Sequence, residues 1–254
     1  MKHYFQNDET LKTEEEKKEV FIKDTKYVFL TDHGVFSKKG LDFGTRTLLE
    51  SIDLSSVNGK VLDFGCGYGP IGIFIKDKTN ADVDMIDVNE RALKLAKSNA
   101  SLNNVSVNVF YSDCYENVEC KYDFIISNPP IRVGNEILYK ILFGAKDYLK
   151  KNGSLIIVIN KNQGAKTVLK KLSEKYEVSV INKNKGFYII KAQNIWQFAL
   201  SLVTLYIGDM LFIFKRVFLN KIIVIGVDEW LTKPKNSEII VREEHTQKQK
   251  MWLS

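Results

Sequence analysis

Three glycines at alternate positions follow an acidic residue in the segment Asp63-Phe64-Gly65-Cys66-Gly67-Tyr68-Gly69. The apolar run Lys60-Val61-Leu62-Asp63-Phe64 predicts a short buried strand, so the glycines fall on the loop at its carboxyl end. Open α/β sheets bind ligands at this end of their strands, and glycine lets the backbone approach a ligand without an intervening Cβ. The loop is therefore the first candidate binding site.

The acid that precedes the glycines limits the kind of ligand. Gly67 to Gly72 also fits the GxGxxG pattern of dinucleotide sites, with Asp87 lying 20 residues after Gly67. Asp87 would accept hydrogen bonds from the ribose of either a nicotinamide or an adenosyl ligand, so glycine spacing does not decide between them. Asp63 does, because a carboxylate beside a pyrophosphate would be repelled. The loop favours a ligand that bears an amino-acid cation.

A second candidate site is Asn128-Pro129-Pro130, which follows the apolar run Phe124-Ile125-Ile126. Proline fixes φ and lacks an N–H group, so the carbonyl of Pro129 can point outward without a partner in the sheet. The side chain of Asn128 adds a second carbonyl acceptor beside it. Two acceptors that converge on one point suit an –NH2 group with two donors.

Both segments belong to a regular alternation of strands and helices that begins at residue 60, which predicts a parallel sheet with helices on both faces. Residues 176–181 and 187–190 break the alternation, because strands joined by a five-residue turn must be antiparallel. The expected fold is α/β, with a mostly parallel sheet that ends in an antiparallel hairpin. Strands are expected at 60–64, 83–87, 105–111, 122–127 and 155–159, and helices at 90–102, 136–149 and 165–172.

The two ends of the chain differ from this central part. Residues 8–26 are rich in charge and predict a solvated helix face or a linker, and residues 28–37 predict a hairpin that turns at Gly34. Residues 195–214 carry one charge, Asp209. A run of this length predicts a docked helix or a membrane segment, and a segment foreign to the fold is a third alternative.

Composition narrows the class of protein. With 44% hydrophobic residues in 254, the chain is not wholly disordered, and it is long enough for a sizeable core. A net charge of +6 fits a nucleic-acid partner, but 32 of the 37 basic residues are Lys, as an AT-rich coding sequence produces. Cys66, Cys114 and Cys120 lack zinc spacing, so we expect no metal and a reduced, cytoplasmic setting. Residues 1–8 predict no signal peptide.

The first loop resembles that of the class I S-adenosylmethionine-dependent methyltransferases. Their first motif, an acid followed by Gly-x-Gly-x-Gly, matches Asp63 to Gly69, and their second-strand acid matches Asp87. The resemblance implies a Rossmann-like, seven-stranded sheet, S-adenosylmethionine as cofactor, and a contact of Asp113 with the adenine amine. It implies cofactor binding by Asp63, Gly65, Cys66, Gly67, Gly69, Asp87, Asp113 and Asn128.

The second segment resembles the Asn-Pro-Pro-aromatic motif of methyltransferases that modify planar amines, which makes Asn128, Pro129 and Pro130 the expected catalytic residues. In a planar amine the lone pair is delocalised, so the nitrogen is a poor nucleophile. Hydrogen bonds to the two carbonyls favour a tetrahedral nitrogen and free the lone pair. Ile131 replaces the usual aromatic, and Phe36 is the expected alternative for stacking on the target.

Together with Gly34-Val35-Phe36-Ser37 and Leu41-Asp42-Phe43-Gly44-Thr45, these motifs resemble the small methyltransferase domain of the guanine-N2 methyltransferases of small-subunit ribosomal RNA, in their short form. The resemblance covers residues 1–192. It implies methylation of N2 of a guanine in 16S ribosomal RNA, with that RNA or the 30S subunit as partner, a monomer, and substrate binding by Phe36, Ile131 and Arg132.

These observations predict three domains and leave two alternative functions open. The expected domains are a hairpin and cap over 1–57, the methyltransferase domain over 58–192, and an extension over 193–254. A glutamine methyltransferase of release factors shares Asn-Pro-Pro and is one alternative. The other is an inactive, membrane-tethered binding protein, because residues 195–214 leave a membrane segment open.

Overall fold

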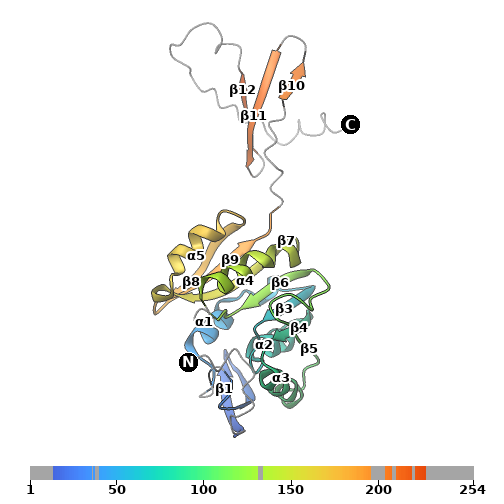
Figure 1. The fold of residues 1–254 in the computed structure, drawn as a ribbon, viewed down its shortest axis with the longest axis vertical. Coiled ribbons are helices and arrows are strands. Elements are labelled where there is room, and N and C mark those ends of the chain that lie inside the picture. Colours follow the sequence, from blue (N-terminus) through green and yellow to red (C-terminus); the bar gives the residue numbers. More distant parts are fainter. Residues whose placement is uncertain are drawn as a thin grey trace. The chain divides into compact units, whose positions relative to one another are not determined.

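A computed structural model describes residues 14–35, 37, 40–130 and 134–195, together with the backbone of 204–207, 210–218 and 221–226 (Figure 1). The chain divides into two units, Met1–Ile195 and Trp196–Ser254. All described candidate site residues belong to the first unit. Phe36, Ile131 and Arg132 lie outside the described residues.

The first unit is built on a seven-stranded sheet with the order β5-β4-β3-β6-β7-β9-β8. The first five of these are parallel, and β9 pairs antiparallel with both β7 and β8, so the predicted sheet and its terminal hairpin are confirmed. Because β3 lies between β4 and β6, the strand order reverses there, where open α/β sheets bind ligands. The strands are β3 (Lys60–Phe64), β4 (Asp82–Asp87), β5 (Asn108–Tyr111), β6 (Tyr122–Ser127), β7 (Leu149–Asn160), β8 (Glu177–Asn184) and β9 (Phe187–Gln193).

Helices cover both faces of this sheet, as predicted (Figure 1). Helices α1 (Phe43–Ser51), α2 (Pro70–Lys78) and α3 (Glu90–Leu102) pack on one face, and α4 (Asn135–Tyr148) and α5 (Ala165–Leu172) pack on the other. Successive residues of a strand point to opposite faces, so a strand covered on both sides is apolar throughout. In β7, Ile156 and Val158 join the first core while Ile157 and Ile159 join the second.

The N-terminal hairpin lies earlier in the chain than predicted. Strands β1 (Glu16–Ile22) and β2 (Thr25–Thr31) pair antiparallel around a turn at Lys23, whose φ is 49°. The prediction of a helix face or linker is therefore wrong over β1. The predicted turn at Gly34 exists, but it follows the end of β2 and joins no second strand among the described residues, so the prediction of a hairpin over 28–37 is wrong. Val20 and Ile22 are buried while Phe21 is exposed, so the charge-rich run belongs to a strand with one face in solvent.

The second unit contains a three-stranded antiparallel sheet of β10 (Thr204–Ile207), β11 (Met210–Phe218) and β12 (Lys221–Gly226). The predictions of a docked or membrane-spanning helix over 195–214 are wrong for β10 and for the part of β11 that falls in this range. Residues rich in Ile, Val, Phe, Tyr and Thr favour strands, and length alone had suggested a helix. No helix among the described residues is long and apolar enough to cross a membrane. A foreign origin of this segment stays a prediction.

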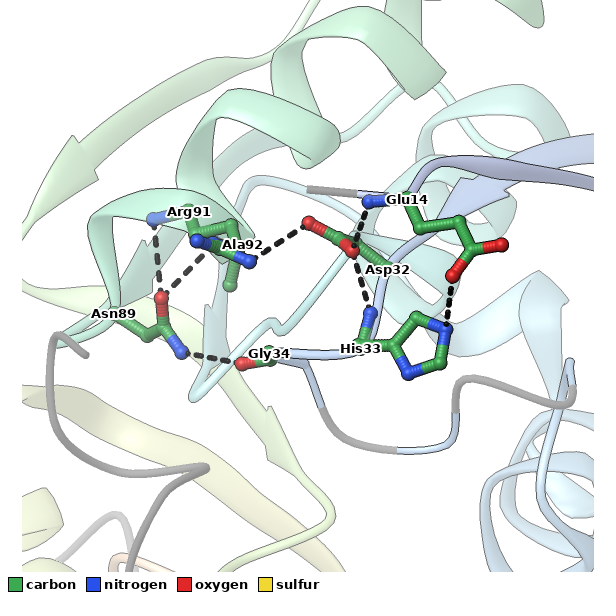
Figure 2. Close-up of polar contacts among 7 residues, drawn as sticks. All are labelled: Glu14, Asp32, His33, Gly34, Asn89, Arg91 and Ala92. Carbon is green, nitrogen blue, oxygen red and sulfur yellow. Dashed lines mark hydrogen bonds and ion pairs between the residues drawn. The ribbon is translucent and has the colours of Figure 1, made fainter. Parts of the chain in front are cut away.

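A buried ion pair attaches the hairpin to α3 (Figure 2). The side chain of Asp32 is 1% exposed, and its Oδ2 accepts a hydrogen bond from Arg91 Nη1 at 3.0 Å. Its Oδ1 accepts from the backbone N–H groups of His33 and Glu14, at 2.6 and 3.0 Å. The end of β2 is therefore fixed against the first turn of α3.

A second contact in the same network holds the chain that follows β2 (Figure 2). Asn89 Oδ1 caps α3 by accepting from the N–H groups of Arg91 and Ala92, at 3.0 and 3.2 Å. Its Nδ2 donates to the carbonyl oxygen of Gly34 at 3.0 Å, and this contact is buried. The same side chain thus begins a helix and positions the segment at Gly34 and Val35.

Removing the cation from this network should cost stability. Arg91→Met leaves the buried carboxylate of Asp32 without its ion-pair partner, so the free energy of unfolding should fall by about 3 kcal/mol. Denaturant titration measures the change, with Lys94→Met on the exposed side of α3 as control. In the double variant Asp32→Asn/Arg91→Met much of the loss should be recovered. Strictly additive losses would contradict the pairing.

Candidate active site

A cavity of about 640 Å³ opens at the carboxyl ends of β3, β4 and β6. Asp63 and Gly69, two further predicted cofactor residues, do not line it. The cavity brings together residues far apart in the sequence, at the point where the strand order reverses. The predicted site residues that line it are Gly65, Cys66, Gly67, Asp87, Asp113, Asn128, Pro129 and Pro130.

The glycine loop is held by backbone bonds that require an unusual conformation. Gly65 and Gly67 have φ of 69° and 56°, a region that residues with a Cβ rarely adopt. A Cβ built on either would meet nothing within 4 Å. The N–H of Cys66 donates to the Ile86 carbonyl at 2.8 Å, which ties the loop to β4. The loop therefore presents bare backbone to open space.

Asp87 ends β4 and holds two neighbouring segments. Its Oδ2 accepts from the Gly67 N–H at 2.8 Å, and its Oδ1 accepts from the Asn89 N–H at 2.9 Å. Burial raises the pKa of this carboxyl, and the two N–H groups act in the opposite direction. A carboxylate oxygen has more than one acceptor site, so Asp87 can still accept hydrogen bonds from hydroxyls in the cavity.

Asp63 lies beneath the glycine loop, fully buried. Its Oδ2 accepts from the Gly72 N–H at 2.8 Å, and its Oδ1 has no hydrogen-bond partner among the described residues. Burial, and next the charge of Asp87, raise the pKa of Asp63 from 3.8 to about 7. Gly72 is required here, because a Cβ would lie 2.6 Å from Met85 Sδ. A direct contact between Asp63 and a cofactor stays a prediction.

Asn128 follows β6 and is oriented by the start of α1. Its Nδ2 donates to Thr45 Oγ1 at 3.0 Å and lies 3.4 and 3.5 Å from the two carboxylate oxygens of Asp42. Asp42 caps α1, since its Oδ1 accepts from the N–H groups of Gly44 and Thr45. Among the described residues, no donor contacts the carbonyl oxygen of Asn128. That oxygen is the atom that remains for a ligand, beside the Pro129 carbonyl.

Sequence reasoning missed Asp42 and Thr45 as site residues, although both line the cavity. The N-cap pattern of an acid just before a helix is visible in the sequence, but its contact with a residue 86 positions away is not. The cavity is also lined by Val35, Tyr68, Asn89, Ser112, Cys114, Ile137, Ile141 and Gln163.

Asp113 lies at the rim of the cavity and is exposed. Its neighbour Ser112 is buried and donates to the Cys114 carbonyl at 2.9 Å, which shapes the loop after β5.

Cys66 is buried in the cavity wall, and burial raises the pKa of its thiol, so the thiol stays protonated. Within the described residues, no group of three His, Cys, Asp or Glu could hold a metal ion.

The raised pKa of Asp63 predicts a pH-dependent stability. The folded state favours the protonated acid, so this contribution is present below about pH 4 and is lost as the pH rises through about 7. The variant Asp63→Asn has no carboxyl to ionise, so its free energy of unfolding relative to that of the wild type should rise by up to about 4 kcal/mol as the pH increases from 4 to 7. Denaturant titrations across this range measure the difference. A constant difference would show that the carboxyl ionises normally.

A model of the methyltransferase small domain family matches residues 26–191. The Bacillus subtilis protein YbxB is 42% identical over 201 residues, which cover 76% of this chain and 98% of that protein. Ribosomal RNA small subunit methyltransferase C of Haemophilus influenzae is 43% identical over 132 residues, which cover 50% of this chain and 40% of that protein. The chain thus spans less than half the length of this second relative.

Two solved structures share the fold at low sequence identity. The 16S rRNA N2 methyltransferase of T. thermophilus, in complex with AdoMet and guanosine, has a TM-score of 0.64 at 22% identity, over 71% of this chain and 50% of that one. A methyltransferase from Pyrococcus furiosus has a TM-score of 0.52 at 22% identity, over 59% of this chain and 80% of that one. With the family match over most of the first unit, these results show that the chain belongs to the methyltransferase small domain family of S-adenosylmethionine-dependent methyltransferases.

Proposed function

We propose that the protein transfers a methyl group from S-adenosylmethionine to the exocyclic N2 of a guanine in 16S ribosomal RNA. The carrying observation is the orientation of Asn128, whose amide nitrogen is held by Thr45 and Asp42. This leaves two carbonyl oxygens, those of Asn128 and Pro129, for an –NH2 group. The relatives that are named as small-subunit ribosomal RNA methyltransferases support the RNA substrate.

The residues of the cavity fit the proposed cofactor. Asp42, Asp87 and Asp113 all line it, and Asp63 lies close behind, so the surroundings favour a cation and oppose a pyrophosphate. We propose that Asp87 accepts the ribose hydroxyls, that Asp113 accepts the adenine amine, and that the backbone at Gly65 and Gly67 lies against the amino-acid part. Bound S-adenosylmethionine supplies an electrophilic methyl group on a sulfonium.

The reaction then depends on how the chain holds the target nitrogen. The N–H groups of the guanine amine donate to the carbonyl oxygens of Asn128 and Pro129, which favours a tetrahedral nitrogen and frees its lone pair toward the methyl group. No side chain has to remove a proton before transfer, because the product ammonium loses one readily. Phe36, Ile131 and Arg132, which lie outside the described residues, are proposed to contact the base and its phosphate.

The same two carbonyls would also suit the amide of a glutamine, so a protein substrate is the competing proposal. The two proteins reported above whose names state a substrate act on small-subunit ribosomal RNA, which favours RNA. An inactive, membrane-tethered protein is disfavoured by the intact cavity and its acids. We further propose that the enzyme acts as a monomer in the cytoplasm.

Transfer of tritiated methyl groups should label 16S ribosomal RNA, either free or in 30S subunits, with N2-methylguanine as the product. Nuclease digestion and chromatography identify the modified base, and calorimetry tests binding of S-adenosylmethionine against NADH as a control. Label in a release factor would support the glutamine alternative, and no label with either substrate would support an inactive protein.

The orientation of Asn128 should determine turnover rather than cofactor affinity. Asn128→Ala should lower kcat by about 10²–10³-fold, because an acceptor aimed at the reacting nitrogen is lost. The dissociation constant for S-adenosylmethionine, measured by calorimetry, should change far less. Turnover equal to that of the wild type would exclude this role.

Thr45 acts through Asn128 and should behave as a positioning residue. Thr45→Val keeps the shape but removes the hydroxyl that accepts from Asn128, so kcat should fall by about tenfold, as expected for one lost hydrogen bond. Thr45→Ser retains the hydroxyl and should restore turnover. Similar kcat values for the two variants would contradict the positioning role.

A further inference from the structure

Positive charge is concentrated in one stretch of the first unit. Residues 161–185 contain seven lysines and two glutamates, a net +5, whereas residues 1–193 together carry only +4. The rest of that unit is therefore close to neutral, and its net positive charge comes from residues 161–185. All seven lysines are exposed: Lys161, Lys166, Lys170, Lys171, Lys175, Lys183 and Lys185.

Two of these lysines lie beside the mouth of the cavity. Lys161 begins the short helix η4 (Lys161–Gln163), whose last residue, Gln163, lines the cavity. The Lys161 N–H donates to the Gly186 carbonyl at 2.7 Å, so the turn between β8 and β9 is held against η4. The sequence neighbour of Gly186 is Lys185, which is thereby brought close to Lys161.

Lys185 also lies near the start of α1. Its Nζ lies 5.3 Å from the centroid of the Phe43 ring, and Phe43 follows Asp42, which lines the cavity. Lys183 is the next-to-last residue of β8, and its Nζ lies 4.9 Å from the centroid of the Tyr188 ring. Aromatic rings under lysine stems reduce the freedom of the ammonium groups while leaving them in water.

The charges of these three residues, which we call the lysine rim (Lys161, Lys183 and Lys185), are not neutralised locally. Among the ion pairs between described residues, none includes a member of the rim. Positive charges that lie close together without acidic partners repel one another, and the binding of a polyanion relieves this repulsion. The backbone of a nucleic acid is such a ligand, and its phosphates are recognised mainly by Lys and Arg.

We propose that the lysine rim binds backbone phosphates of the RNA strand that flanks the target nucleotide, and so guides that nucleotide into the cavity. The proposal rests on the proposed function, since the target enters beside Asn128. The RNA strand then runs along the edge of the cavity that is lined by Gln163 and Asp42. An acidic protein is the other class of partner that the test addresses.

Salt dependence of RNA binding tests the rim directly. Each phosphate contact to a single strand contributes about 0.7 to the slope of log Kd against log salt concentration, so Lys161→Ala/Lys185→Ala should lower the slope by about 1.4. The probe is a fluorescent single-stranded fragment of 16S RNA. The matched control is Lys94→Ala/Lys97→Ala, which removes the same charge from the exposed side of α3, beside β4 and β5.

Methyl transfer provides a second readout. At moderate salt, KM for RNA should rise about tenfold or more in the rim variant, while kcat and the affinity for S-adenosylmethionine should stay within about twofold of the wild type. The control variant should match the wild type apart from a small uniform effect of net charge. Lys161→Arg/Lys185→Arg keeps both charges and should retain the wild-type slope and KM.

The outcomes separate this inference from the proposed function. Equal slopes for the rim and control variants, in an enzyme that methylates 16S RNA, would overturn the rim alone. A wild-type protein that methylates no RNA would overturn the proposed function, and the salt dependence of RNA binding would still test whether the lysine rim contacts phosphates. Unchanged RNA binding with lost binding of a release factor would assign the rim to a protein partner and overturn the inference.

Discussion

The carboxylate of Asp87 joins three parts of the site through two short hydrogen bonds. One oxygen holds the glycine loop through Gly67, and the other holds the N–H of Asn89. Asn89 in turn begins α3 and fixes the Gly34 carbonyl (Figure 2). Two linked side chains, those of Asp87 and Asn89, therefore set the end of β4, the loop after β3 and the segment after the hairpin relative to one another, and residues of all three segments line the cavity.

Charge divides the first unit according to the ligands we propose. The carboxylates of Asp42, Asp87 and Asp113 line the cavity, and behind it lies Asp63, whose pKa burial raises to about 7. Lysines gather just outside it, between η4 and the turn that joins β8 to β9. A small cation and a large polyanion can then occupy adjacent positions without competing, because each meets the opposite charge. Net charge alone conceals this arrangement, since the two contributions nearly cancel.

Much of the fold could be predicted from local patterns, and what could not depended on distant contacts. The strands after residue 60 alternate with helices, and the short turn after β8 required an antiparallel end, so the sheet was predicted correctly. The charge-rich run at Glu16 concealed a strand because only Val20 and Ile22 face the core. The apolar run after Ile195 had the length of a helix, but its residue types favour strands. Asp42 and Thr45 were missed because nothing local links α1 to Asn128.

Gly72 explains why one sequence pattern suggested two cofactors. A Cβ at this position would lie 2.6 Å from both Met85 Cγ and Sδ, and 3.2 Å from Asp63 Oδ2, so only glycine lets α2 lie this close to β3 and β4. The last glycine of the GxGxxG pattern thus meets a mechanical requirement of a helix packed against parallel strands, and it does not line the cavity. The last glycine of the pattern therefore indicates how close a helix lies to the sheet, whereas the acidic residues around the cavity indicate which ligand binds.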